Sequence, residues 1–438
     1  MAGMSIDGLV SGMDTTTLIS QLMQLERQPQ TLLRTKLTDT KADASAYRTV
    51  NSTFSTLQSA AEALTKATAW APAKASSSST TVSASASAGA ATGSVTFTVD
   101  KLAATHTMIS ANDWVNPSSA TKITAGTPAF SVDLPAGTSL ADAVTKINVA
   151  ATAAASGVVA TAVSTGSGMR LQLAAKNSGA AGTFTVGGGL SFETLAAGAD
   201  AKLTVGSGTY TFPVTSSSNN FTDLLAGSTF TVSKQGETAT VTVASDPAAV
   251  TTAVQSLVTA ANTVLSTIRE YSNNAPGSTA VLRGDSSLRG LSSQVVEAVT
   301  YAVGTLGSAA GAGIQLSKDG QRIEFSADRF SAKLKADPGL AQNLVNGSGS
   351  VPGVAQRLLK VAQDASNSTT GTLATLAKGK DTEATDLQKR IDDWDLRLEL
   401  RQQTLTRQFS AMESALGSLQ NQSSWLSSQL GSLPSWSK

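Results

Sequence analysis

The ends of the chain carry apolar residues at helical spacing. Near the C-terminus they recur at steps of three and four, which places them on one face of a helix. At 1.5 Å per residue, residues 405–430 span about 39 Å. This stripe consists of Leu405, Phe409, Met412, Leu416, Leu419, Leu426 and Leu430. Upstream, Ile391, Trp394 and Leu398 extend it at heptad spacing, so a helix is predicted from about Asp381–Thr382 to about residue 430.

A second helical pattern occupies the N-terminal end, over residues 14–37. Asp14, or one of the threonines after it, is a suitable N-cap. The apolar positions here are Leu18, Leu22, Leu25, Leu33 and Leu37. Pro29 lacks a backbone N–H, so the helix should kink or break near Arg27–Gln28 before the pattern resumes over 47–64.

The middle of the chain has a two-residue period typical of half-buried strands. Val95, Phe97 and Val99 alternate with threonines, and only 139–149 and 221–225 look helical. Further strands are predicted at 130–134, 158–163, 169–173, 183–186, 202–205, 209–212, 229–232 and 238–243.

The helical period returns at Asp246, a candidate N-cap, followed by Pro247 at the first helical position. The remaining predictions are helices over 250–271, after "GDSS" at 284–287 and over 353–366, with a hairpin at 314–325 turning at Lys318–Gly320. The fold class is therefore α+β and multidomain, with helices at both ends and a β-rich middle.

The composition of the chain argues against several classes of function. Charged residues make up 14% of the chain, against about a quarter in ordinary globular proteins, and the net charge is +1. No basic block supports nucleic-acid binding, and the absence of cysteine excludes disulfides and thiolate metal sites. The N-terminus has no signal-peptide pattern, and no apolar run is long enough to predict a membrane span.

Candidate chemistry is sparse. His106 is the single histidine, and we interpret it as a strand-side or surface residue. Asp392, Asp393 and Asp395 spread over more than one helical face, which favours a charged surface over a metal site. The "RGD" at 283–285 lies just before a predicted helix, where its aspartate is a capping candidate. We therefore predict no catalytic, metal or cofactor-binding residues and no cofactor. The terminal stripes fit both an intramolecular helical hairpin and intermolecular bundling.

Five stretches resemble one family when taken together. They are "GLVSGMDTTTLISQLMQLERQP" at 8–29, "SLADAVTKINVA" through "NSGAAG" at 139–182, "LRGDSSLRGL" at 282–291, "GIQLSKDGQRIEFSADRF" at 313–330 and "QFSAMESALGSLQNQSSWLSSQL" at 408–430. In this order they are similar to the bacterial flagellar filament-capping family, FliD or hook-associated protein 2. Val10 and Met13 depart from its usual opening but stay apolar, and Arg322–Ile323 lengthen the segment after "KDG".

The resemblance implies a coiled-coil-like stem, a helical leg and two β-rich head modules. The expected stem helices are 1–40 and 385–438, and the leg pairs 41–72 with 247–384. The expected head is a β-rich module made of 73–110 and 201–246, into which a flagellin-type β-rich module, 111–200, is inserted.

The family's function, by resemblance, is to sit as a ring-like homo-oligomer at the flagellar tip, where it retains exported flagellin and promotes its folding and polymerisation. No enzymatic activity is implied. The implied partners are further copies of the chain, flagellin, the hook–filament junction protein and an export chaperone at the C-terminal helix. Export would use the flagellar apparatus without a cleavable signal. The stripe residues at both ends would then pack between subunits or within the filament.

Three alternatives stay open at this point. The first is another exported axial protein, namely the junction protein or flagellin, although these lack the "GDSSLR" and "SSWLSSQL" combination. The second is a surface adhesin that uses the β-rich head for cell adhesion. The weakest is an enzyme such as a glycosidase, because the acidic residues of the head show no paired spacing.

Overall fold

A computed structural model describes residues 14–431. Internal contacts divide the chain into two units: a β unit, Lys66–Thr252, and a helical unit formed by the segments before and after it. The helices outside the β unit are α1 (Thr15–Glu26), α2 (Gln28–Thr65), α5 (Ser286–Thr300), α6 (Ala327–Ala336), α7 (Pro338–Asn346), α8 (Val354–Ser366) and α9 (Thr372–Gly431). Helix α4 (Pro247–Ser272) begins in the β unit and continues into the helical unit.

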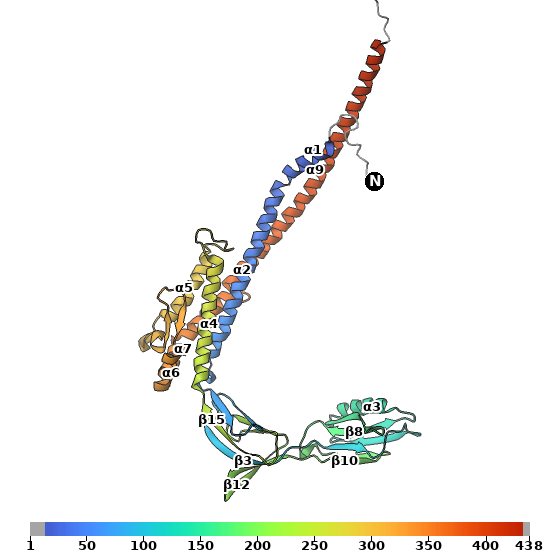
Figure 1. The fold of residues 1–438 in the computed structure, drawn as a ribbon, viewed down its shortest axis with the longest axis vertical. Helices are drawn as coiled ribbons and strands as arrows, with labels where there is room; N and C mark the ends of the chain where they lie inside the picture. The colour runs from blue at the N-terminus through green and yellow to red at the C-terminus, as the bar shows by residue number, and fades with distance from the viewer. Residues whose placement is uncertain (1–13, 432–438) are drawn as a thin grey trace, which may run out of the picture. The chain divides into compact units, whose positions relative to one another are not determined.

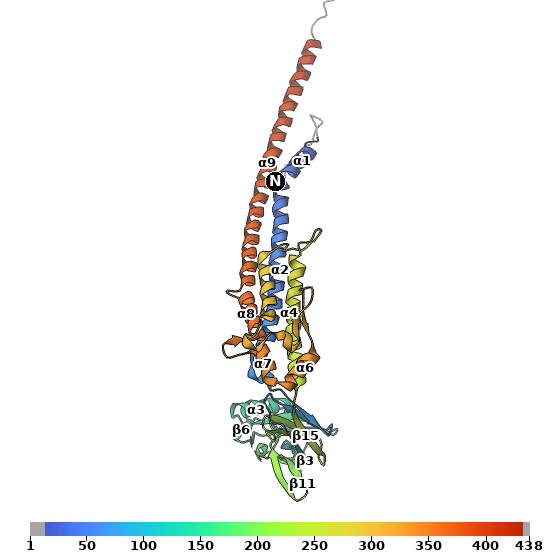
Figure 2. The ribbon, with the colours of Figure 1, turned by 90° about the vertical axis from the view of Figure 1, so that its left-hand side faces the viewer.

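The core of the helical unit forms around α2, which packs against α8 and α9. In both views α4 also runs beside α2 (Figures 1 and 2). Side chains of α2 at steps of three and four are fully buried: Val50, Phe54, Leu57, Ala61 and Leu64. Each large apolar side chain buried in this way contributes about 1.5–3 kcal/mol to folding. The pattern over 47–64 therefore marks a true core face.

Helix α4 begins where the sequence predicted. The carboxylate of Asp246 accepts a hydrogen bond from the N–H of Ala249 at 3.3 Å, and Pro247 is the first helical residue. Among the described residues, α4 is the one helix long and apolar enough to cross a membrane by length and composition. Val254, Leu257 and Val264 on it are buried inside the protein, so a buried core helix accounts for this composition.

Asp285 is the N-cap of helix α5, as predicted, and this residue has two roles. Its Oδ1 accepts from the N–H of Leu288 at 2.8 Å, capping the helix, and its Oδ2 accepts from the Tyr47 hydroxyl at 2.6 Å. The predicted hairpin is also confirmed, with β16 (Ile314–Leu316) paired to β17 (Ile323–Phe325). The short strands β18 (Gly347–Ser348) and β19 (Val351–Pro352) form a second pair.

The predicted start of the last helix was wrong. Helix α9 begins at Thr372, not near Asp381–Thr382, and it runs unbroken through Gly379. The glycine interrupts the apolar pattern, but Leu373, Ala377 and Ala384 are buried on one face. Their packing outweighs the cost of about 1 kcal/mol for a glycine within a helix. The expected boundaries at 40/41 and 384/385 both fall inside continuous helices, α2 and α9.

The β unit contains two modules. The first has a five-stranded sheet in the order β1-β15-β3-β11-β12 and a three-stranded sheet, β13-β14-β2. Phe97 and Phe230 stack with ring centroids 5.9 Å apart in the core of this module. Its strands are β1 (Ala73–Ser77), β2 (Val82–Ala86), β3 (Gly93–Lys101), β11 (Ala201–Ser207), β12 (Tyr210–Ser216), β13 (Asn220–Thr222), β14 (Ser228–Val232) and β15 (Thr238–Ser245).

The second module is inserted between β3 and β11. It has a sheet in the order β10-β4-β8-β7 and another in the order β6-β5-β9, with one helix, α3 (Leu140–Ala153). Leu134, Ile147 and Leu171 are fully buried in its core. The strands are β4 (Thr107–Ser110), β5 (Thr121–Ala125), β6 (Phe130–Leu134), β7 (Val158–Ser164), β8 (Met169–Ala175), β9 (Val186–Gly188) and β10 (Phe192–Ala196).

Three details of the β unit differ from the sequence predictions. Strand β4 pairs with β8 and β10, so the inserted module begins before Thr107 and not at residue 111. Residues 221–225 are not helical, because β13 occupies their start and Asp223 has a positive φ of 59°. The strand expected at 183–186 begins only at Val186, after a short 3-10 turn over Ala180–Gly182.

We expect the Tyr47–Asp285 contact to stabilise the helical unit. Tyr47→Phe removes one hydrogen bond and should cost about 0.5–1.5 kcal/mol. Asp285→Ala removes that bond and the helix cap together, so it should cost more, about 1–3 kcal/mol. Urea unfolding of both variants measures the difference. Equal stability of Asp285→Ala and the unmodified chain would contradict this role.

The same contact should show a pH dependence. Burial, the hydrogen bond to Asp285 and its negative charge raise the pKa of Tyr47 above its ordinary value. Because the folded-state pKa lies above the unfolded value of about 10, this stabilisation is fully present below about pH 10 and is lost at higher pH. Tyr47→Phe should therefore lose less stability than the unmodified chain as the pH rises above about 10, as measured by thermal unfolding.

Candidate functional site

The N-terminal helices α1 and α2 both pack along the C-terminal helix α9 (Figure 1). Leu37 on α2 is buried against Ala384, Leu387 and Ile391 on α9, with Leu33 partly buried beside them. The heptad step from Ile391 to Leu398 and Leu405 keeps the α9 face turned towards the N-terminal helices. The predicted intramolecular helical pairing is therefore present.

Helix α1 packs against α9 through a different face from the one the sequence suggested. Met23 is buried with Leu398 and Leu405, and Ile19 packs beside them. Leu18, Leu22 and Leu25 are instead exposed, by 40%, 38% and 64%. The buried and half-buried positions follow the series 19, 23, 26, 30, 33 and 37, at steps of four and three. The leucines favoured the neighbouring stripe as the buried face of α1. The position of α9 decides which of the two faces is buried.

The helix break predicted at Pro29 is confirmed, since α1 ends at Glu26 and α2 starts at Gln28. Just after the break, the buried Gln30 donates from Nε2 to Asp395 Oδ1 at 2.6 Å and to the carbonyl of Ile391 at 3.4 Å. Arg34 forms an ion pair with the other oxygen of Asp395 at 3.4 Å. Sequence analysis did not single out Gln30, because a polar residue in an apolar stripe looks like an exposed position.

The apolar contact of α9 with α1 and α2, which we call the seam, has ion pairs beside it. Lys380 lies 3.0 Å from Asp43, and this hydrogen bond raises the pKa of the lysine. Lys36 lies 3.2 Å from Glu383, and its hydrogen bond lowers the pKa of that carboxyl. Near the helix break, Arg401 pairs with Glu26 at 3.4 Å. Exposed pairs of this kind contribute about 0–1 kcal/mol each, so the apolar contacts dominate the pairing.

Beyond Phe409, α9 continues past α1, and Figures 1 and 2 both show this extension. Met412 and Leu416 are half-buried, but every side chain from Ser418 to Gln429 is exposed. Leu419, Trp425 and Leu426 are exposed by 60%, 62% and 55%. We call residues 412–429 the α9 extension. The side chain of Leu430 lies outside the described residues.

The predicted stripe residues thus fall into three groups. The buried or partly buried ones, within the chain itself, are Leu33, Leu37, Ile391, Trp394, Leu398, Leu405 and Phe409. The exposed ones are Leu18, Leu22, Leu25, Leu419 and Leu426, and the half-buried ones are Met412 and Leu416. Among the described residues, the apolar stripe continues after its intramolecular partner α1 has ended, and such a stripe is a surface available for other helices.

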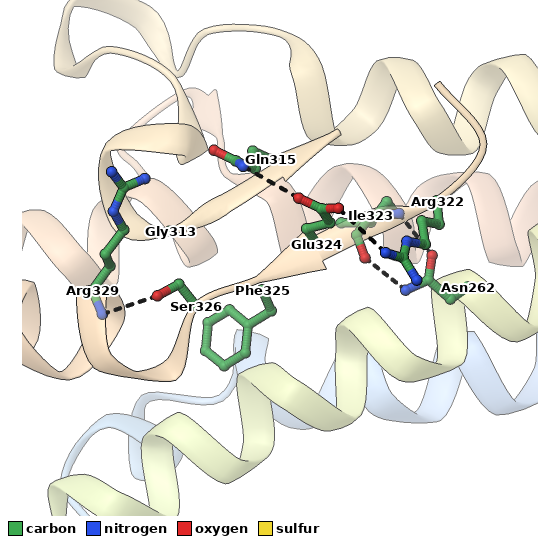
Figure 3. A pocket seen from close by; sticks show the side chains of 9 residues that line it. All are labelled: Asn262, Gly313, Gln315, Arg322, Ile323, Glu324, Phe325, Ser326 and Arg329. Atoms are coloured by element: carbon green, nitrogen blue, oxygen red, sulfur yellow. Dashed lines mark hydrogen bonds and ion pairs between the residues drawn. The ribbon is translucent and has the colours of Figure 1, made fainter. Parts of the chain in front are cut away.

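A groove of about 410 Å³ lies beside the hairpin of the helical unit (Figure 3). Its polar groups largely satisfy one another. The Asn262 side chain donates to the carbonyl of Ile323 and accepts from its N–H, both at 2.7 Å, and so acts as a neighbouring strand would. Glu324 pairs with Arg322 at 3.5 Å and accepts from Gln315 at 3.4 Å. The two hydrogen bonds of Asn262 thus anchor the hairpin to α4.

The other sequence candidates have structural partners. His106 is buried and hydrogen-bonded to backbone groups. Asp395 binds Gln30 and Arg34, while Asp392 accepts from Gln388. Both carboxylate oxygens of Asp285, the aspartate of the "RGD", are used inside the chain. Over residues 14–431, no three or more histidine, cysteine, aspartate or glutamate side chains group to hold a metal ion.

Comparison with protein families gives three matches. The model "Flagellar hook-associated protein 2 C-terminus" matches residues 198–421, just over half of the chain. The model "Flagellar hook-associated protein 2 N-terminus" matches 11–106, and the "Flagellin hook IN motif" matches 122–177. The last range lies within the inserted module. A search of curated proteins found no match.

Solved structures add a likeness in fold. The D1-D2-D3 domains of the flagellar cap protein FliD from Escherichia coli align with a TM-score of 0.60 and 26% identity, covering 76% of this chain and 99% of that one. FliD D2-D3 domains from E. coli (TM-score 0.34, 22% identity) and FliD from Pseudomonas aeruginosa (0.33, 20%) cover 40% and 42% of this chain and 100% and 94% of their own. Because one family model spans more than half of its length, the chain belongs to the flagellar hook-associated protein 2 family.

Proposed function

We propose that this protein caps the distal end of a bacterial flagellar filament as a ring-like homo-oligomer. In this role it retains exported flagellin and promotes its folding and polymerisation, without enzymatic activity. Family membership supports the cap assignment, as does the likeness to the E. coli structure described as a flagellar cap protein.

The α9 extension is the observation that carries the assembly part of the proposal. An apolar helix face left in water forgoes about 25 cal/mol for every Å² that could be buried. Only Arg407 and Glu413 are charged in the stretch 405–430, so copies can approach without strong like-charge repulsion. The exposed face of α1 at Leu18, Leu22 and Leu25 offers a second apolar surface of the same unit. We assign both faces to contacts between subunits or with the filament.

The remaining partners follow from the same role. A cap at the filament end must contact flagellin, and before filament growth it must contact the hook–filament junction protein. The α9 extension is also a suitable surface for an export chaperone, which would cover it until secretion. We place the protein at the flagellar tip after export by the flagellar apparatus without a cleavable signal. The division into stem (1–40 and 385–438) and leg (41–72 and 247–384) remains part of this proposal.

The two halves of the α9 stripe should respond differently in the isolated chain. Leu405→Ala removes a buried side chain from the contact with Met23, so the α1–α9 contact should lose about 2 kcal/mol or more. Leu426→Ala changes an exposed side chain and should stay within about 0.5 kcal/mol. Hydrogen exchange of the α1 amides measures this. Similar hydrogen exchange of the α1 amides in the two variants would show that the contact with Leu405 does not stabilise α1.

Assembly should depend on the extension and not on exposed leucines in general. The double variant Leu419→Asp with Leu426→Asp places two charges on the proposed interface, where burying them is costly. The matched control is Leu396→Asp with Leu400→Asp. Those leucines are exposed to a similar degree, 60% and 54%, but lie on the opposite face of α9 from the stripe.

Each variant would be expressed in a strain that lacks its own copy of the gene. We expect the stripe variant to release flagellin into the medium and to form short or no filaments, while the control forms normal ones. Circular dichroism should show the same helix content in both variants. Normal filaments with the stripe variant would overturn the assigned role of the extension.

A further inference from the structure

The single histidine of the chain lies where the inserted module joins the first module. Two segments connect the modules, 102–106 entering and 197–200 leaving, and we call them the neck. His106 is at the end of the entering segment and is only 4% exposed. Ala104 and Ala199 pair across the neck through backbone hydrogen bonds of 2.8 and 3.1 Å.

The partners of the imidazole fix its protonation state. Its Nε2 lies 3.0 Å from the carbonyl of Phe184, which can only accept, so Nε2 carries a proton and donates it. Its Nδ1 lies 3.3 Å from the N–H of Gly198, which can only donate, so Nδ1 is unprotonated and accepts. The ring must therefore be neutral. It links the leaving segment of the neck to the core of the inserted module.

The surroundings of the ring are tight. Phe184 packs edge-to-face against it, with centroids 4.8 Å apart. A side chain at position 198 would meet the carbonyl oxygen of Gly179 at 2.8 Å and the Cβ of His106 at 3.1 Å, so only glycine fits there. These contacts leave the imidazole little freedom to turn away from Gly198.

The imidazole's hydrogen-bond and ring partners, Phe184 and Gly198, are uncharged. On the segments that pack against it, the charged residues are Lys176 and Asp200. Asp200 Oδ1 accepts a hydrogen bond of 2.7 Å from the N–H of Ala180.

We propose that His106 is a pH-sensitive latch of the neck. A proton added to Nδ1 faces the N–H of Gly198, so the hydrogen bond becomes a repulsion between two donors. The charge that results is buried without a partner, which is unfavourable. Protonation of the ring therefore releases the leaving segment and gives the inserted module more freedom. The latch works within the β unit and does not depend on the cap role.

The test compares the full chain with His106→Gln. Glutamine offers one acceptor and one donor, as the neutral ring does, but takes up no proton in this range. Hydrogen exchange of the neck amides, corrected for the intrinsic effect of pH on exchange, would be measured at about pH 7.5 and about pH 5. We expect protection at Ala104, Gly198 and Ala199 to fall about tenfold in the unmodified chain and to change little in His106→Gln. Equal pH responses of the two proteins would overturn the latch.

A second measurement covers the case in which the substitution disturbs the module. The chain has one histidine, so its side-chain ¹⁵N resonances are unambiguous and report the tautomer directly. We expect a protonated Nε2 and an unprotonated Nδ1 at about pH 7.5, with protonation of Nδ1 coinciding with loss of neck protection. A proton on Nδ1 at neutral pH, or titration without any change in neck protection, would refute the proposal.

Discussion

The burial of apolar side chains between α2 and α9 joins the two terminal segments of the helical unit. These helices come from opposite ends of the sequence, so the contact between Leu37 and Ile391 joins residues that are separated by most of the chain. Contacts of such high sequence separation must offset a loop-closure entropy that grows with the length of the intervening chain. The β unit lies within this closure as an insertion with its own cores, and its first module is itself closed by the long-range pairing of β1 with β15.

The lengths of the paired helices explain why part of the apolar stripe of α9 is exposed. Helix α9 has 60 residues, while α1 begins only at Thr15 and ends at the break before Gln28. The seam uses α9 up to Leu405 and Phe409, and the same heptad repeat then continues without a partner in the described chain. A stripe with little charge on either side suits burial among other helices better than a solvated end.

Much of this architecture could be predicted from the sequence because local signals agree with the fold. Asp285 and Pro247 mark helix starts by their own chemistry, and the alternation around Phe97 marks a strand whichever sheet it joins. The errors arose where only a distant partner decides. Leu18, Leu22 and Leu25 have the same spacing as the Ile19–Met23 face, and nothing local shows which one α9 covers. Strand β4 looked like part of the first module because its partners β8 and β10 lie far along the chain.

The Gln30–Asp395–Arg34 cluster has a consequence for the alignment of the two helices. The apolar residues of α9 repeat every seven positions, so sliding the helix by one heptad would still set a large apolar side chain against Met23. The polar cluster removes this ambiguity. A heptad slip in either direction would put Gln388 or Gln402 where Asp395 stands, leaving Arg34 opposite an uncharged amide. The hydrophobic contacts thus hold the helices together, and one buried glutamine with its carboxylate partner selects a single alignment among near-equivalent ones.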